Sequence, residues 1–257
     1  MSCSHRDSTL WVVSHNVSER DKELSLMQHL KELRSRLMVA AFGVLVTTTL
    51  AFFFAKDIIL LLEAPAHLGK PLQIISPTEG FTTYMRVSLF TGIALSMPII
   101  LYEIYAYINP ALRPNERRFL LTLGPFVLLL FVGGMAFCYF LLLPNAINFL
   151  FTFGSEVFEA APRASEYISF VTTFILGVGL VFEMPVIIFA ITSIGLVKRS
   201  WLAKQRRYVV LLVFVLGAVI TPTPDPFNQT LVAIPMYLLF ELGLLLSRFG
   251  GGLRRAS

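Results

Sequence analysis

Residues 98–118, PIILYEIYAYINPALRPNERR, are the stretch from which the rest of the chain can be interpreted. The stretch begins inside an apolar run, carries one acid, Glu103, among aromatic residues, and turns at Asn109 and Pro110. It ends in a charged cluster formed by Arg113, Glu116, Arg117 and Arg118. Because apolar chain lies on both sides of this polar turn, the pattern predicts a short reversal at a membrane surface.

The composition indicates an integral membrane protein. Of the 257 residues, 56% are hydrophobic and only 14% are charged, and the mean hydropathy is +0.73, a balance that a water-soluble domain cannot bury. The apolar residues occur in long runs and do not alternate, which favours helices because a helix satisfies its own backbone groups in lipid. We therefore predict an all-α polytopic membrane protein.

The apolar runs before and after the turn at residues 108–118 predict six membrane-spanning helices in all. These are residues 37–55, 87–108, 119–143, 168–197, 208–220 and 230–246. The fifth run reaches only about 20 Å at roughly 1.5 Å per residue, short of the ~30 Å hydrocarbon core, and the sixth is also brief. We therefore expect the last two spans to form a short hairpin around TPTPDPFNQ.

The remaining segments lie outside the spans. Residues 1–23 are polar and are expected to be a disordered tail without a cleaved signal peptide, residues 24–247 a single membrane domain, and residues 248–257 a cytoplasmic tail. Residues 56–86 and 144–167 are expected to be a structured cap and a loop on the far side. An amphipathic lead-in helix at the membrane surface is predicted by the spacing of Leu26, Leu30, Leu33 and Leu37.

The basic residues predict the orientation. Nearly all of the 21 Lys and Arg lie in the N-terminal segment before the first span, the turn at 108–118, the loop at 198–207 and the C-terminal tail. The exceptions are Lys56, Lys70, Arg86 and Arg163. Since basic loops stay in the cytoplasm, both termini are predicted to be cytoplasmic. The net charge of +5 reflects this topology, and no nucleic-acid partner is predicted.

The sequence offers little for catalysis. All four histidines lie outside the predicted spans: His5, His15, His29 and His67. The spans therefore hold no Ser–His pair, zinc motif or haem ligand, and no phosphate-binding GxxxxGK[ST] loop occurs. We predict no catalytic residue, no metal and no cofactor.

Glu183 is the acid whose position is most costly. It lies deep in the fourth predicted span, where an ionised carboxylate costs at least ~2.5–3.5 kcal/mol, so it must be protonated, hydrated or paired. Pro185 removes a helix hydrogen bond and predicts a kink beside it. We favour a functional role for Glu183. The alternative is a neutral glutamate that is hydrogen-bonded to a neighbouring helix.

The other acids have ordinary explanations when each is taken alone. Glu103 lies near the cytoplasmic end of the second span and can either reach the headgroups or bind a ligand. Glu116 follows Pro114 and Asn115 at the predicted start of the third helix, where the helix dipole favours a carboxylate. Glu32 can pair with Arg36, four residues further along a helix.

Six stretches in order give the chain a family resemblance. They are HLKELRSRL (29–37), SPTEGF (76–81), PIILYEIYAYINPALRPNERR (98–118), FCYF (137–140), FEMP (182–185) and TPTPDPFNQTLVAIPMYLLFE (221–241). With these stretches in this order and spacing, the chain resembles the TatC family. TatC is a component of the twin-arginine, Sec-independent protein translocase. The resemblance covers nearly everything after about residue 24.

The resemblance implies a receptor for cargo that crosses the membrane folded, with signal peptides that carry consecutive arginines. It assigns recognition of these arginines to Glu32 and Glu116. It also implies that Tyr107, Pro110, Leu112 and Arg117 are signal-peptide-binding residues on either side of Glu116. Two adjacent guanidiniums can each take a bidentate contact that lysine cannot reproduce. Each such bond contributes roughly 1.5–3 kcal/mol, enough to distinguish RR from KK.

The resemblance also implies partners and a location. Glu183, with Glu103, would be an intramembrane polar group, and Glu183 would face a concave pocket. The hairpin that meets the single-span proteins TatA and TatB would carry Thr221, Pro224, Asp225 and Gln229, although Gln229 can equally bond within the chain. We expect self-association in a larger complex, export driven by the proton-motive force, and a bacterial or archaeal cytoplasmic (inner) membrane.

A six-span transporter or channel for small solutes is the alternative, because such proteins also use intramembrane acids and broken helices. It predicts inverted repeats, and the two halves of the sequence do not match convincingly. An intramembrane protease would need a base, which the spans lack.

Overall fold

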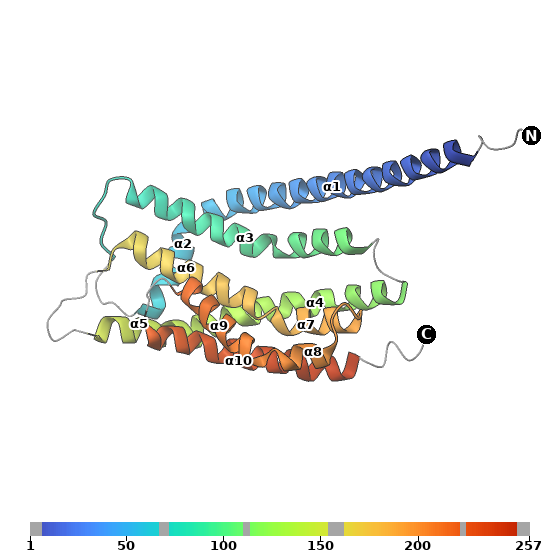
Figure 1. Cartoon of the computed structure of the whole chain (residues 1–257). Helices are drawn as coiled ribbons and strands as arrows, with labels where there is room; N and C mark the ends of the chain where they lie inside the picture. The colour runs from blue at the N-terminus through green and yellow to red at the C-terminus, as the bar shows by residue number, and fades with distance from the viewer. Residues whose placement is uncertain (1–6, 67–71, 110–113, 154–161, 222–224, 251–257) are drawn as a thin grey trace, which may run out of the picture.

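The computed structural model describes residues 7–66, 72–109, 114–153, 162–221 and 225–250, which are almost entirely helical (Figure 1). The helices are α1 Asp7–Phe53, α2 Ala55–Glu63, α3 Glu79–Ile108, α4 Pro114–Phe137, α5 Leu143–Thr152, α6 Ala164–Val181, α7 Met184–Ser193, α8 Arg199–Lys204, α9 Arg206–Ile220 and α10 Pro226–Gly250, with short segments η1 Ala64–Ala66 and η3 Cys138–Leu142. Within these ranges the only β-structure is an isolated bridge between Gln73 and Arg163. The predicted all-α class is confirmed.

The spans also follow the prediction, with one correction. Five stretches of the described chain are long and apolar enough to cross a membrane: His29–Phe53, Glu79–Ile108, Leu121–Thr152, Ala164–Ser193 and Pro226–Arg248. The expected short helix is α9, with 15 residues. The expectation that the last span is also short was wrong, because α10 has 25 residues. Proline is favoured in the first turn of a helix, so α10 begins at Pro226 and includes residues assigned to the hairpin turn.

Helix α1 joins segments that were predicted to be separate. It runs without interruption for 47 residues, so residues 7–23, the lead-in and the first span share one helix. The expectation of a lead-in helix separate from the first span was therefore wrong, because the two are parts of one helix. The physical reason is that residues 7–42 contain no Pro or Gly and many good helix formers. Residues 1–6 and 251–257 lie outside the described residues, and the division into tails and one domain stays a prediction.

The third apolar helix continues beyond its predicted end. After α4 the chain passes through η3, a π-helical turn in which the Leu143 N–H bonds to the Cys138 carbonyl, and continues as α5 to Thr152. The expectation of a loop from Pro144 was therefore wrong for residues 144–152. Pro144 lies in the first turn of α5, where its missing N–H is least costly. Residues 154–161 lie outside the described residues.

The fourth apolar helix is broken, as predicted from Pro185. Helix α6 ends at Val181 and α7 begins at Met184. In the break, the Glu183 N–H bonds to the Leu180 carbonyl at 3.2 Å, a spacing of three residues that tightens the last turn. Pro185 then lies in the first turn of α7, where it interrupts no helical bond.

The bundle has two ends, which Figure 1 separates clearly. At the right of the picture lie the N-terminal part of α1, the end of α3, the start of α4, α8 and the end of α10. At the left lie α2, the start of α3, the end of α5 and the start of α6. The end of α3, the start of α4 and the two ends of the described chain therefore lie at the same end of the bundle (Figure 1).

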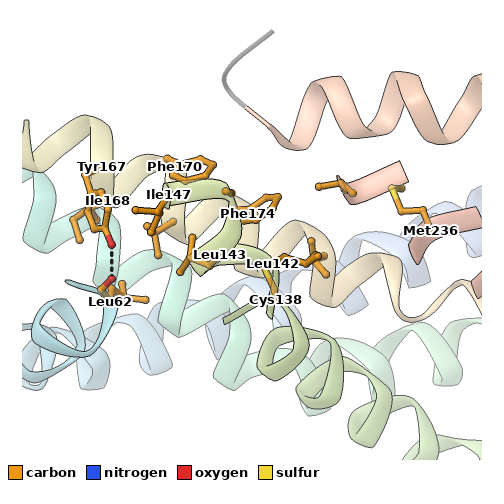
Figure 2. Packing of buried hydrophobic residues seen from close by; sticks show 14 of the residues in the cluster. Leu62, Cys138, Leu142, Leu143, Ile147, Tyr167, Ile168, Phe170, Phe174 and Met236 are labelled. Carbon is orange, nitrogen blue, oxygen red and sulfur yellow. Dashed lines mark hydrogen bonds between the residues drawn. The ribbon is translucent and has the colours of Figure 1, made fainter. Parts of the chain in front are cut away.

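Buried side chains from several helices hold the bundle together. The largest cluster lies where η3, α5 and α6 meet, and α9 and α10 contribute to it. Fully buried members, drawn in Figure 2, are Cys138, Leu143, Ile168 and Phe174. The Tyr167 hydroxyl donates to the Leu62 carbonyl at 2.9 Å (Figure 2), and Tyr139 donates to Leu61 at 2.8 Å. These bonds satisfy carbonyls at the end of α2 and fasten it to the bundle.

Helix α1 packs against α3 through small residues. The Thr47 hydroxyl donates to the Gly92 carbonyl on α3 at 2.8 Å, so the two backbones lie very close at this level. Gly43 of α1 lies against the Ile99 side chain of α3. This contact sets the register between the two helices that carry the candidate site.

At the other end, one buried acid joins the starts of two helices. Gln73 accepts the Ala164 N–H at 2.9 Å, which closes the bridge beside α6. The Glu79 side chain, 2% exposed, lies 3.6 Å from the Arg163 guanidinium. The Glu79 carboxylate also accepts three backbone N–H groups, those of Ile75, Ser76 and Ser165. The predicted structured cap on this side therefore has a charged centre.

Candidate functional site

An arginine bridges two acids at the end of the bundle that carries the quoted turn. The Arg36 guanidinium contacts Glu32 of its own helix, with Nη2 3.3 Å from Oε1, and Glu103 of α3, with Nη1 3.2 Å from Oε2. The predicted pairing of Glu32 with Arg36 is present. Glu103 is directed at this guanidinium and only 11% of its side chain is exposed, whereas 37% of the Glu32 side chain is exposed.

Aromatic side chains lie beside this bridge. His29 of α1 stacks on Tyr107 of α3, with ring centroids 4.7 Å apart. His29 lies three residues before Glu32, so the two side chains share one face of α1. Tyr107, named from the resemblance, is therefore placed next to the Glu32 end of α1. The Tyr105 hydroxyl lies 3.4 Å from Asn109 Oδ1.

The second predicted acid belongs to a different helix. Glu116 lies in the first turn of α4, as predicted, but its side chain lies outside the described residues. Pro110 and Leu112 also lie outside them. Arg117 is exposed on the same turn of α4, and the Tyr105 hydroxyl lies 3.5 Å from its carbonyl oxygen. The backbone thus brings the start of α4 to the end of α3 that carries Tyr107.

Glu183 lies far from these acids, in the break between α6 and α7. Its side chain is buried, and among the described residues neither carboxylate oxygen has a hydrogen-bond partner. Burying a polar group without a partner costs about 1–3 kcal/mol. The described chain therefore does not contain the neighbouring-helix partner that the alternative interpretation required.

The hairpin residues make bonds within the chain. The Gln229 side chain donates to the Phe214 carbonyl of α9 at 2.8 Å, and the Thr221 hydroxyl donates to the Gly217 carbonyl at 2.8 Å. Asp225 caps α10 by accepting the Asn228 N–H at 2.7 Å. Pro224 lies outside the described residues. The Gln229 donor group is thus engaged internally, in agreement with the second of its two predicted roles.

Two contacts could not be assigned from the sequence. Arg36 was seen only as a partner of Glu32, since its contact with Glu103 spans 67 residues and depends on how α1 lies against α3. The pairing of His29 with Tyr107 depends on the same register. The sequence does place a basic residue four positions after an acid, and this spacing predicts the contact of Arg36 with Glu32 but not its contact with Glu103. Within the described residues, no group of His, Cys, Asp or Glu side chains is arranged to hold a metal ion.

These features define a polytopic helical membrane protein with an acid–guanidinium cluster at one end and a buried carboxyl in a broken span. The family model described as Sec-independent protein translocase protein (TatC) matches residues 28–235. The chain belongs to the TatC family, and it is thus a membrane component of a protein translocase.

Relatives and solved structures agree with this assignment. TatC of Carboxydothermus hydrogenoformans is 33% identical over 230 residues, which cover 89% of this chain and 95% of the relative. TatC of Escherichia coli K12 is 39% identical over 228 residues, covering 87% and 88%. A crystal structure described as the twin-arginine translocase receptor TatC superposes with a TM-score of 0.79 at 35% identity, covering 87% of this chain and 99% of that one.

Proposed function

We propose that this chain is the receptor and core subunit of a twin-arginine translocase. It binds the RR signal peptides of folded cargo and assembles with TatA and TatB for export driven by the proton-motive force. It acts by binding and transport and not as an enzyme. The observation that carries the proposal is the Arg36 guanidinium held between Glu32 and Glu103, since it supports guanidinium binding by acids at this end of the bundle.

The chemistry of the acids fits a pair of arginines. A guanidinium has five N–H donors in a planar fork, whereas an ammonium group is a compact point charge. Carboxylates on separate helices can each take one of two neighbouring guanidiniums, which repel each other. Glu32 on α1 and Glu116 at the start of α4 are the two acids proposed for this role. Tyr107, Pro110, Leu112 and Arg117 are proposed as the residues that accompany Glu116 in recognition.

The proposed receptor function is tested by peptide binding. Replacing Glu32 or Glu116 with Gln removes one charge-assisted contact, so each variant is expected to bind a labelled RR peptide roughly 10–150-fold more weakly, and the double variant more weakly still. Fluorescence anisotropy on the full chain in lipid nanodiscs measures this. Glu166→Gln is the matched control, because Glu166 is exposed at the opposite end. Wild-type affinity in both single variants would refute the receptor assignment.

The proposed location is the cytoplasmic (inner) membrane of a bacterium or archaeon, with both termini in the cytoplasm. The distribution of Lys and Arg supports it. Figure 1 gives independent support, since the start of α1 and the end of α10 lie at one end of the bundle. The acid cluster then faces the compartment where cargo is made.

Partner assembly is proposed for Glu183 and for the hairpin of α9 and α10, with Thr221, Pro224, Asp225 and Gln229 as contact residues. The unpartnered Glu183 carboxyl supports this, because a partner helix can supply the missing donor. The internal bond of Gln229 leaves its side-chain oxygen to accept from a partner.

Glu183→Ala is expected to reduce recovery of TatA and TatB with this chain from native membranes, while Glu183→Gln retains most of it because an amide still accepts a hydrogen bond. Co-purification in mild detergent measures the difference. Thermal unfolding of the chain alone serves as the control, because it shows whether a variant loses partners only through a loss of stability. Glu183→Gln should unfold close to wild type, since it exchanges one unpaired buried polar group for another of similar size. Equal, undiminished recovery in both variants would show that the carboxyl is dispensable.

A further inference from the structure

The acid pair already holds a guanidinium that belongs to the chain itself. Arg36 gives one nitrogen to Glu32 and the other to Glu103, so each acid receives a single contact, at 3.3 Å and 3.2 Å. Charge-assisted bonds are strongest when two parallel N–H groups meet one carboxylate at about 2.7–2.9 Å. The bridge is therefore weaker at each acid than a bidentate pair would be.

The two acids differ in how accessible they are. The Glu32 side chain is 37% exposed and the Glu103 side chain 11%. An arriving guanidinium reaches Glu32 more readily, while Glu103 keeps its contact with Arg36. When an arriving guanidinium replaces Arg36 at Glu32, Arg36 thus stays paired with Glu103. This matters because an unpaired charge would be costly in this partly buried place.

We propose that Arg36 is a built-in occupant of the acid pair, and that a signal-peptide arginine binds by replacing its contact with Glu32 while Arg36 remains on Glu103. This inference rests on the proposed function, and it adds a competition step to it. Every ligand must release Glu32 from Arg36 before it binds, so the affinity of the receptor is lowered by the fraction of time that Glu32 is occupied. Glu103 acts here as a positioning residue, which holds the displaced Arg36.

Competition predicts a particular pattern among variants. Arg36→Gln should raise the affinity for an RR peptide about two- to fivefold, which is the strength of a partly exposed ion pair. It should raise the affinity for a matched KK peptide by the same factor, because both ligands displace the same contact. Lys31→Gln is the matched control, since it removes an equal charge from the preceding turn of α1 but no ion pair of Lys31 occurs within the described chain.

Glu103→Gln should lower the affinity, because Arg36 then has Glu32 as its remaining acid and holds it more firmly. In the Arg36→Gln background the same substitution should have a much smaller effect, because the competitor is gone. This lack of additivity separates displacement from a simple loss of charge, which would give equal effects in both backgrounds. The double variant also removes the buried, unpaired Glu103 carboxylate that Arg36→Gln alone leaves behind.

The experiment measures anisotropy of labelled RR and KK peptides on the full chain in nanodiscs, with thermal unfolding as a check of folding. Should Arg36→Gln fail to fold, the comparison of the double variant with Glu103→Gln tests the same point, and the double variant should bind more tightly. If Glu32→Gln weakens binding but removing Arg36 does not strengthen it beyond the Lys31 control, displacement is wrong and the receptor function stands. Normal RR binding by both Glu32→Gln and Glu116→Gln would overturn the receptor function itself.

Discussion

Gly92→Ala is expected to lower the free energy of unfolding by about 1–3 kcal/mol, although it adds only one methyl group. A Cβ at this position would lie 2.6 Å from the Thr48 Cα and 2.7 Å from its backbone nitrogen, and it would also overlap the Thr48 hydroxyl. Two of these atoms are backbone atoms of α1, so no change of rotamer relieves the overlap. The helices must move apart, and the bond from Thr47 to the Gly92 carbonyl is then lost.

Thermal unfolding in detergent measures this effect, and Gly133→Ala in α4 is the matched control. Apart from its own stretch of helix, no atom of the described residues lies within 4 Å of a Cβ added at Gly133, and alanine is a better helix former than glycine by roughly 1 kcal/mol. The control should therefore be neutral or slightly stabilising. A Gly92 variant as stable as the control would mean that α1 and α3 do not approach as closely as described.

The same substitution should impair the acid cluster from a distance. Arg36 lies on α1 and Glu103 on α3, and their contact of 3.2 Å tolerates little movement between the helices. The stacking of His29 on Tyr107 crosses the same interface. A folded Gly92 variant is thus expected to bind the RR peptide differently from wild type, although Gly92 itself cannot touch the peptide. Packing at small residues and recognition at the end of the bundle are physically linked.

Local features of this chain could be predicted because they depend on neighbouring residues. The break at Glu183 follows from Pro185, and the pairing of Glu32 with Arg36 follows from helical spacing. Helix ends were predicted less well, because hydropathy reports exposure to lipid and not helical structure. Helix α10 begins before its apolar run, and α5 continues past Pro144, since backbone bonding does not stop where lipid contact does.

Contacts between distant segments could not be predicted from spacing. The bridge from Arg36 to Glu103 requires the register of α1 against α3, which one methyl group at Gly92 would alter. Glu79 appeared in the sequence only as part of SPTEGF, and nothing in that stretch indicates that it binds the Ser165 N–H, 86 residues away. The residues with the most consequential contacts are therefore those whose partners come from other helices.

Glu79→Ala is expected to lower the unfolding temperature by about 5 °C or more, because this carboxylate joins two helix starts. Its Oε2 accepts the N–H groups of Ile75 and Ser76 at 2.9 and 3.2 Å, and its Oε1 accepts that of Ser165 at 3.1 Å. The Ser165 N–H lies in the first turn of α6, where it has no partner within the helix, while Ile75 and Ser76 lie just before α3. A carboxylate at a helix start also offsets the positive end of the helix dipole. Alanine leaves all three donors and the Arg163 guanidinium without this acceptor.

Glu166→Ala is the matched control, since Glu166 pairs with the same arginine at 3.2 Å but is 71% exposed. Exposed ion pairs contribute little, so this variant should unfold close to wild type. Hydrogen exchange gives a sharper test, because Glu79→Ala should accelerate exchange of the Ile75, Ser76 and Ser165 amides first. Glu79→Gln should fall between the two variants, as one side-chain oxygen can still accept. If Glu79→Ala and Glu166→Ala prove equally stable, Glu79 does not join the two helix starts, and the cap is held by its apolar contacts alone.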